Sequence, residues 1–189
     1  MRDETDRPLT PEEKRALLDV ARNAVESAVK GQSLPEFHYD FSIFKENRGA
    51  FVTLHRHGEL RGCIGYVFAV KPLMDTVVDM AQAAALRDPR FTPVSVEELS
   101  ELDIEISVLS LLRKATLINE IQIGVHGIYI KKGVHTGLLL PQVAVEYGWD
   151  RSRFLEQTCY KAGLPGTAWQ DEDTEIEIFS AEVFSDSDV

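Results

Sequence analysis

Cys63 is the residue of this 189-residue chain whose neighbours best suit it to chemistry. Side chains alternate along an extended strand, so Arg61 and Cys63 are expected on one face. A cation beside a cysteine favours the thiolate, which is the form that acts as a nucleophile or ligand. Gly62 and Gly65 would let a ligand approach the strand closely. The segment therefore predicts a nucleophilic or ligand-binding thiol.

A purely structural interpretation fits the same residues. Cys63 would then be a small buried side chain, and the two glycines would serve tight sheet packing. Arg61 would pair with a carboxylate instead of the sulfur. Residue types alone leave both interpretations open.

A cysteine nucleophile usually needs a base, and histidine is the commonest one. Four histidines are considered as the base: His55, His57, His126 and His135. His126 comes at the start of an expected strand, where it could enter a cleft, and it is our first choice. The first two depend on strand register, because a shift of one residue moves them to the face opposite Cys63.

Four further polar residues could complete a site. Asp88 and Arg90 flank a proline that ends a helix, and they serve either as a cap with a surface ion pair or as substrate ligands. Gln142 and Glu146 are four residues apart, hence on one helical face, and could hydrogen-bond a polar ligand. Cys159 lies on an apolar helical face and is expected in the core.

Several kinds of site are not expected. Two cysteines supply neither a disulfide framework nor a four-cysteine zinc site, and they cannot form the cysteine triad of a radical-SAM cluster. His55 and His57 would make only a weak metal site. The segment Gly62–Gly65 lacks the lysine of a phosphate-binding loop. We therefore expect no metal, and the sequence names no cofactor.

Composition restricts the partners and the compartment. A formal net charge of −11 disfavours binding to a phosphate backbone, so nucleic acid is not an expected partner. No apolar run approaches the roughly 18 residues that cross a membrane. The N-terminal segment Met1–Arg7 is polar and lacks the apolar core of a signal peptide. We therefore expect a cytoplasmic protein.

Hydrophobic periodicity predicts the elements that must position these residues. Helical spacing covers 11–30, 72–86 and segments after 141 and 150, whereas alternation indicates strands at 51–55, 60–64, 102–108, 127–132, 134–140 and 174–184. Hairpins dominate over regular βαβ units. The expected class is α+β, with a mostly antiparallel sheet flanked by helices.

Several blocks, in order, resemble the AMMECR family. They are Leu60-Arg61-Gly62-Cys63-Ile64-Gly65, Asp88-Pro89-Arg90-Phe91 followed by Pro93, the block Gly137–Ala144 with Glu146, and Cys159-x-Lys161-Ala162-Gly163-Leu164 with Trp169. The resemblance implies a single domain over 1–189, ordered over about 9–184. It also implies two lobes, the smaller from the middle of the chain, with the first block beside a cleft between them. Members are often encoded beside Memo-like and radical-SAM proteins, which makes both possible partners in an AmmeMemoRadiSam system.

Two functions are carried forward from these observations. The first is a thiol-dependent enzyme in which Cys63, Arg61 and His126 act on a small molecule or a modified macromolecule. The second is a non-catalytic binding or scaffold protein that works with the Memo-like and radical-SAM proteins. In both, the residues expected to line the cleft are Gly62, Ile64, Gly65, Asp88, Arg90, Gln142 and Glu146.

Overall fold

The computed structural model describes residues 7–188, which form two compact units. Unit 1 comprises 7–109 and 182–188, and unit 2 comprises 110–181. The last strand, β7 (Glu175–Ser185), has residues in both. Helices and antiparallel strands make up each unit, so the predicted α+β class is confirmed.

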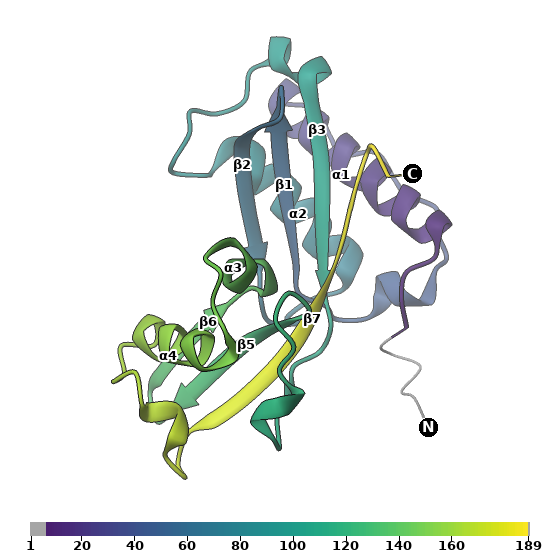
Figure 1. Cartoon of the computed structure of the whole chain (residues 1–189). Coiled ribbons are helices and arrows are strands. Elements are labelled where there is room, and N and C mark those ends of the chain that lie inside the picture. Colours follow the sequence, from purple (N-terminus) through teal and green to yellow (C-terminus); the bar gives the residue numbers. More distant parts are fainter. Residues whose placement is uncertain (1–6, 189) are drawn as a thin grey trace. The chain divides into compact units, whose positions relative to one another are not determined.

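Unit 1 contains two long helices and an antiparallel set of strands (Figure 1). Its elements are α1 (Pro11–Lys30), η2 (Ser42–Lys45), β1 (Ala50–Arg56), β2 (Glu59–Tyr66), α2 (Leu73–Leu86), η3 (Val96–Glu101) and β3 (Leu102–Leu109), where η denotes a 3-10 helix. Strand β1 pairs with β2 on one side and with β3 on the other. Strand β2 is therefore the outer strand of this set.

Helix α1 begins and ends where the sequence predicts. The Thr10 hydroxyl accepts the Glu13 N–H, and the Glu13 carboxylate accepts the Thr10 N–H, which completes a capping box. Pro11 occupies the first turn, and Gly31 ends the helix in the left-handed conformation at φ 64°.

The two faces of the β2–β1–β3 strands differ in character. Val52 and Leu54 of β1 are fully buried on the side where α1 and α2 pack (Figure 1). The opposite side, here called the Cys63 face, consists of alternate residues brought into register by the pairing: Phe51, Thr53, His55, Cys63, Gly65, Asp103, Glu105 and Ser107. Polar side chains are therefore concentrated on one face and apolar ones on the other.

Unit 2 is built on a second set of antiparallel strands with short helices. Its elements are β4 (Arg113–Lys114), η4 (Ile118–Glu120), β5 (His126–Lys132), β6 (His135–Leu139), α3 (Pro141–Glu146), α4 (Arg151–Lys161), η5 (Ala168–Gln170) and the first part of β7. Strand β5 pairs with β6 and β7, and β4 pairs with β7. Its core includes Ile128, Ile130, Phe154 and Cys159, all fully buried.

Hydrogen-bonded structure extends beyond the expected bounds of 9–184. Arg7 makes two hydrogen bonds to the buried Glu13 carboxylate. Asp186 accepts the Ile104 N–H at 2.9 Å and pairs with Arg22 of α1. Residues 1–6 and 189 lie outside the described residues. Most of the polar N-terminal segment 1–7, on which the expected cytoplasmic location partly depends, is therefore not described. No helix within 7–188 is long and apolar enough to cross a membrane.

Candidate functional site

Cys63 lies in the middle of β2, directly opposite Thr53 of β1. The Thr53 hydroxyl donates a hydrogen bond to Cys63 Sγ across 3.3 Å. Cys63 is partly exposed, whereas Thr53 is buried. The residue is thus partly exposed, and a neighbouring side chain is hydrogen-bonded to its sulfur.

The outward backbone groups of Cys63 are bound by Asp88 and Arg90. Asp88 Oδ2 accepts the Cys63 N–H at 2.9 Å, and Arg90 Nη2 donates to the Cys63 C=O at 3.2 Å. The two side chains also pair with each other at 2.7 Å. An outer strand exposes unpaired N–H and C=O groups, and this ion pair satisfies them as a neighbouring strand would.

Asp88 and Arg90 form the ion pair that the sequence offered as one interpretation, but its acidic member is buried. The Asp88 side chain is 2% exposed, whereas that of Arg90 is 54% exposed. Hydrogen bonds from Arg90 are the main reason that the pKa of the Asp88 carboxyl is held well below its usual range, and the Cys63 N–H lowers it further. The pKa of Arg90 is raised, chiefly by its hydrogen bonds with Asp88. Arg90 is therefore a cation that is bound to the backbone of Cys63.

Arg61 is placed differently from the sequence prediction because β2 contains a bulge. Leu54 pairs with Gly62, whereas His55 pairs with Leu60, which leaves Arg61 as the extra residue. A simple alternation from Arg61 to Cys63 therefore does not describe this strand.

The guanidinium of Arg61 is bound to a carboxylate. It makes two hydrogen bonds to Glu98, of 2.8 and 3.0 Å, and a third to the Thr92 C=O. Its side chain is 13% exposed. Pairing with Arg61 lowers the pKa of Glu98 to about 2. Arg61 thus has the partner that the structural interpretation assigned to it.

The space beside the two glycines is filled by protein. A Cβ on Gly62 would lie 2.2 Å from the Ala84 C=O of α2, and one on Gly65 would lie 2.3 Å from the Phe51 ring. Gly62 therefore permits the close packing of α2 on β2, and Gly65 accommodates an aromatic ring. Ile64 is partly buried and packs against the core of unit 1. Packing accounts for these residues without a ligand.

The strand register places one histidine on the Cys63 face. Thr53 faces Cys63, so His55, two residues further along β1, lies on the same side. Diagonal neighbours of this kind are about 7–8 Å apart at Cα. His57 instead sits in the β1–β2 turn at φ 54°, with Nε2 3.3 Å from Glu101. His55 is therefore the histidine of β1 that shares a face with Cys63.

The remaining predicted site residues belong to unit 2. His126 Nδ1 accepts the Gln122 N–H at 3.1 Å, and burial is the main cause of the lowered pKa of His126. Gln142 and Glu146 are exposed on α3, and His135 is exposed on β6. A cleft shared by His126, α3 and Cys63 would join residues of both units, and it stays a prediction.

Cys159 is a core residue, as the sequence predicts. It is fully buried on α4, and burial raises the pKa of its thiol. Both cysteines are free. Within residues 7–188, no group of three or more His, Cys, Asp or Glu side chains is arranged to hold a metal ion.

Two residues of this region are not predicted from the sequence. Thr53 binds Sγ, and a hydroxyl between Val52 and Leu54 was a usable signal. Glu98 accepts the Ser95 N–H and also binds Arg61. Asp88 is an expected cleft residue, but its contact with the Cys63 N–H has no signal in the sequence, because 25 residues separate the two.

Comparison with known proteins agrees with the blocks identified in the sequence. The sequence profile of the AMMECR1 family matches residues 18–184. A protein of Methanothermobacter thermautotrophicus is 44% identical over 186 residues, which cover 94% of this chain and 96% of that protein. Protein TK0174 of Thermococcus kodakarensis is also 44% identical, over 90% of this chain and 88% of its own length. The crystal structure of uncharacterized protein PH0010 from Pyrococcus horikoshii is 40% identical, with a TM-score of 0.77 and 89% of each chain covered. The chain belongs to the AMMECR1 family.

Proposed function

We propose that this protein is a cytoplasmic, thiol-dependent enzyme whose nucleophile is Cys63. The observation that carries the proposal is the way Cys63 is held. Its N–H, its C=O and its sulfur are bound by Asp88, Arg90 and Thr53, while the residue remains partly exposed. Fixing a reactive atom while leaving it accessible is what covalent catalysis requires.

The roles of the neighbours follow from their positions. Arg90, which donates to the Cys63 C=O, supplies the positive charge that favours the thiolate, a role that the sequence had suggested for Arg61. His55, on the same face, is the base that takes the Sγ proton. The sulfur then bonds to an electrophilic carbon of a small molecule or a modified macromolecule, and the leaving group departs with the electrons of its bond.

A non-catalytic binding or scaffold role is the second candidate, and it has its own support. Arg61 is fully engaged with Glu98 and the Thr92 C=O, and the glycines around Cys63 serve packing. Such a site could grip a ligand or a partner without reacting. By resemblance, that partner would be a Memo-like or radical-SAM protein of an AmmeMemoRadiSam system.

The test is the rate at which iodoacetamide alkylates Cys63, in a Cys159→Ala background that removes the second thiol. We expect Arg90→Ala to slow alkylation at neutral pH about threefold or more, because a cation that is bound to the Cys63 backbone is lost. Thr53→Val should slow it by a smaller factor, because it removes the hydrogen bond to Sγ while keeping the side-chain shape.

Arg61→Ala is the matched control, since it also removes an arginine of this region, but one whose hydrogen bonds go to Glu98 and the Thr92 C=O and not to Cys63. Its alkylation rate should equal that of the parent. Equal rates in the parent and in both Arg90→Ala and Thr53→Val would remove the case for a nucleophile and leave the binding role.

A further inference from the structure

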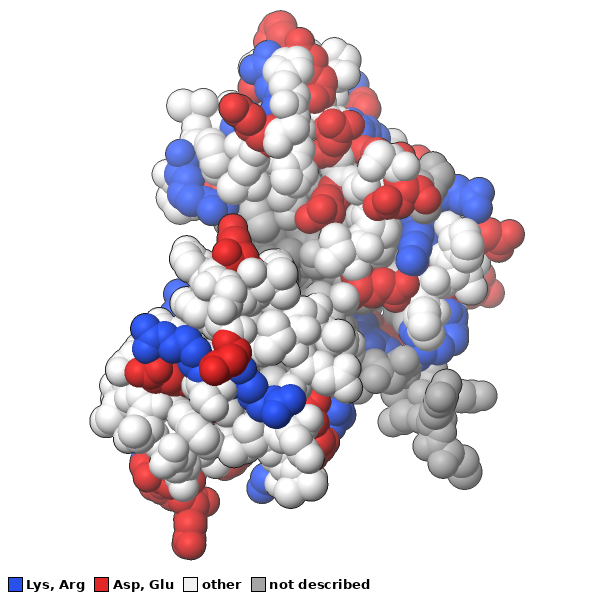
Figure 2. All heavy atoms as spheres, viewed as in Figure 1, with Lys and Arg blue, Asp and Glu red and all other residues white. Residues whose placement is uncertain are grey.

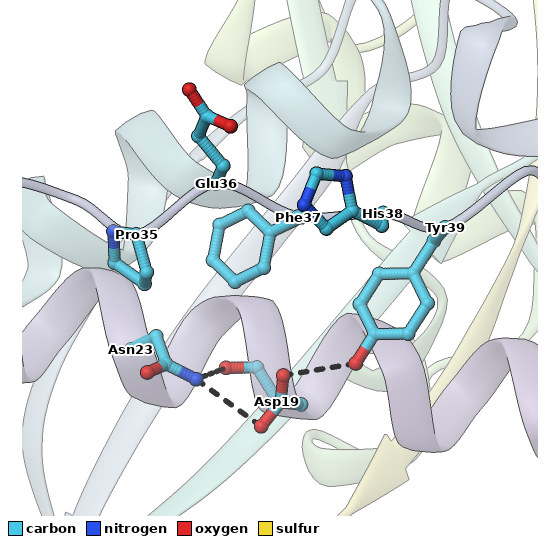
Figure 3. A pocket seen from close by; sticks show the side chains of 7 residues that line it. All are labelled: Asp19, Asn23, Pro35, Glu36, Phe37, His38 and Tyr39. Atoms are coloured by element: carbon cyan, nitrogen blue, oxygen red, sulfur yellow. Dashed lines mark hydrogen bonds between the residues drawn. The ribbon is translucent and has the colours of Figure 1, made fainter.

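Residues 32–41 form an irregular segment that follows α1 and precedes η2. Figure 3 shows part of it running along α1. Its side chains alternate, because Phe37, Tyr39 and Phe41 are half-buried against the core of unit 1, whereas the residues between them are exposed. The three rings are stacked in sequence, with centroids 6.4 and 6.2 Å apart. One side of the segment is therefore anchored by aromatic packing.

A hollow of about 380 Å³ lies between this segment and α1 (Figure 3). Asp19 and Asn23 of α1 line one side of it, and residues 35–39 line the other. The hollow is thus lined by aromatic side chains of the segment and by polar side chains of the helix.

The carboxylate of Asp19 is held in place at this hollow. Oδ2 accepts the Tyr39 hydroxyl at 2.9 Å, and Oδ1 accepts Asn23 Nδ2 at 3.1 Å. Burial, and next the hydrogen bond with Asp19, raise the pKa of Tyr39. Within residues 7–188, no Lys, Arg or His side chain forms an ion pair with Asp19 or with Glu36. The hollow therefore presents a fixed negative charge that lacks a cation.

The backbone of the segment is also available. Among residues 7–188, no backbone-to-backbone hydrogen bond involves 33–40; the nearest ones are Gln32 N–H to Ser27 C=O and Phe44 N–H to Phe41 C=O. Apart from Pro35, which has no N–H, these residues offer N–H and C=O groups, and such a run is a template for adding a strand from another chain. Side chains that alternate between inward and outward positions are typical of a segment that pairs with a strand.

We propose that residues 33–40, together with Asp19, form a docking surface for an extended basic segment of a partner protein. The partner strand lies beside 33–40, and its Lys or Arg side chain reaches Asp19 across the rings of Phe37 and Tyr39, where cation–π attraction adds to the ion pair. Charge complementarity favours a basic partner, because the chain carries a net charge of −11 and the hollow is lined by Asp19 and Glu36, with His38 as its one basic side chain and no Lys or Arg. Basic and acidic side chains are interspersed on the face of unit 1 in Figure 2, so the contact depends on this local charge. The proposal does not depend on Cys63.

The probe is a capped peptide of alternating Lys and Val residues, whose binding is measured by titration calorimetry. We expect Asp19→Asn to raise the dissociation constant about threefold, as for loss of one exposed ion pair, and Asp19→Lys to raise it further. Glu172→Gln, an exposed acid of unit 2, removes the same charge and should leave the constant unchanged. Equal losses in Asp19→Asn and Glu172→Gln would mean non-specific attraction and overturn the proposal.

Hydrogen exchange and a modified peptide test the strand pairing. The bound peptide should slow amide exchange in residues 33–40, and a peptide N-methylated at alternate residues should bind at least about tenfold more weakly. Unchanged exchange in 33–40 at saturation, or equal binding of the methylated peptide, would refute strand docking. Equal affinity for N-acetyl-lysine amide would instead indicate a site for a small cation.

Discussion

Cys63 lies on an outer strand, partly exposed and hydrogen-bonded through its sulfur, its N–H and its C=O. Cys159 lies on the inner face of α4, fully buried among the apolar side chains of unit 2. Each cysteine is followed, within a few residues, by a glycine that approaches protein atoms closely or closes a turn. The residue type is the same, but side chains that hydrogen-bond to the residue from distant segments are found at Cys63.

This difference shows where reactivity comes from. Burial is the main influence on Cys159, because it disfavours the charged thiolate and raises the pKa of the thiol. At Cys63, a hydroxyl, a carboxylate and a guanidinium each form a hydrogen bond with a different atom of the residue. A reactive thiol needs such neighbours as well as access.

The largest expected effect is on the rates at which the two thiols are alkylated. In the folded protein at neutral pH, iodoacetamide should modify Cys63 on the order of 100-fold faster than Cys159, because the buried thiol reacts only after local opening. Mass spectrometry of peptides taken over time measures both rates in one sample. Similar rates for the two thiols would remove the contrast between the regions.

Asp88→Asn should have the next largest effect, on stability. It weakens the bonds to Arg90 and Cys63 at a buried position, and we expect a loss of about 2 kcal/mol in the free energy of unfolding at pH 7. The measurement is urea unfolding followed by circular dichroism. Asp103→Asn, at an exposed position of β3, is the matched control and should change stability by less than about 0.5 kcal/mol.

Asp88→Asn should also change how the free energy of unfolding depends on pH. The pKa of Asp88 is lower in the folded protein than in the unfolded chain, where it is about 3.9. The ionised carboxylate therefore contributes fully to the free energy of unfolding above about pH 3.9, and this contribution is lost as the pH falls below that value. The stability difference between the parent and Asp88→Asn should therefore shrink below about pH 4. A difference that stays constant from pH 6 to pH 2.5 would show that the carboxylate charge is not what stabilises this edge.

Arg61→Lys should have the smallest effect. A lysine cannot reproduce the two parallel bonds to Glu98, so we expect a loss of about 0.5–1 kcal/mol in unfolding free energy. Thermal melts at pH 7 should detect it. Alkylation of Cys63 should stay at the parent rate, and a clear slowing would restore Arg61 as a partner of the thiol.

Much of the fold could be predicted because its signals are local. The capping box at Thr10, the left-handed Gly31 and the alternation in β3 each depend on residues close in sequence. The buried position of Cys159 followed from its helical face in the same way.

The surroundings of Cys63 could be predicted only in part. The bulge at Arg61 depends on how β1 and β2 pair, and the contact of Asp88 with Cys63 depends on where the chain returns after α2. Neither leaves a pattern in a single sequence. The glycines at 62 and 65 had been read as room for a ligand, but α2 and the Phe51 ring, both set by tertiary packing, fill that space.

The most direct test of the central claim compares the alkylation rate of Cys63 in the folded protein with its rate in the unfolded chain. In the Cys159→Ala background, the alkylation rate at pH 7 is measured for the folded protein and again in urea, where Cys63 is an ordinary exposed thiol. If Asp88, Arg90 and Thr53 prepare Cys63 for reaction, the folded protein should react at least about tenfold faster than the unfolded chain. A folded rate equal to or below the unfolded rate would contradict the claim that Cys63 is a nucleophile.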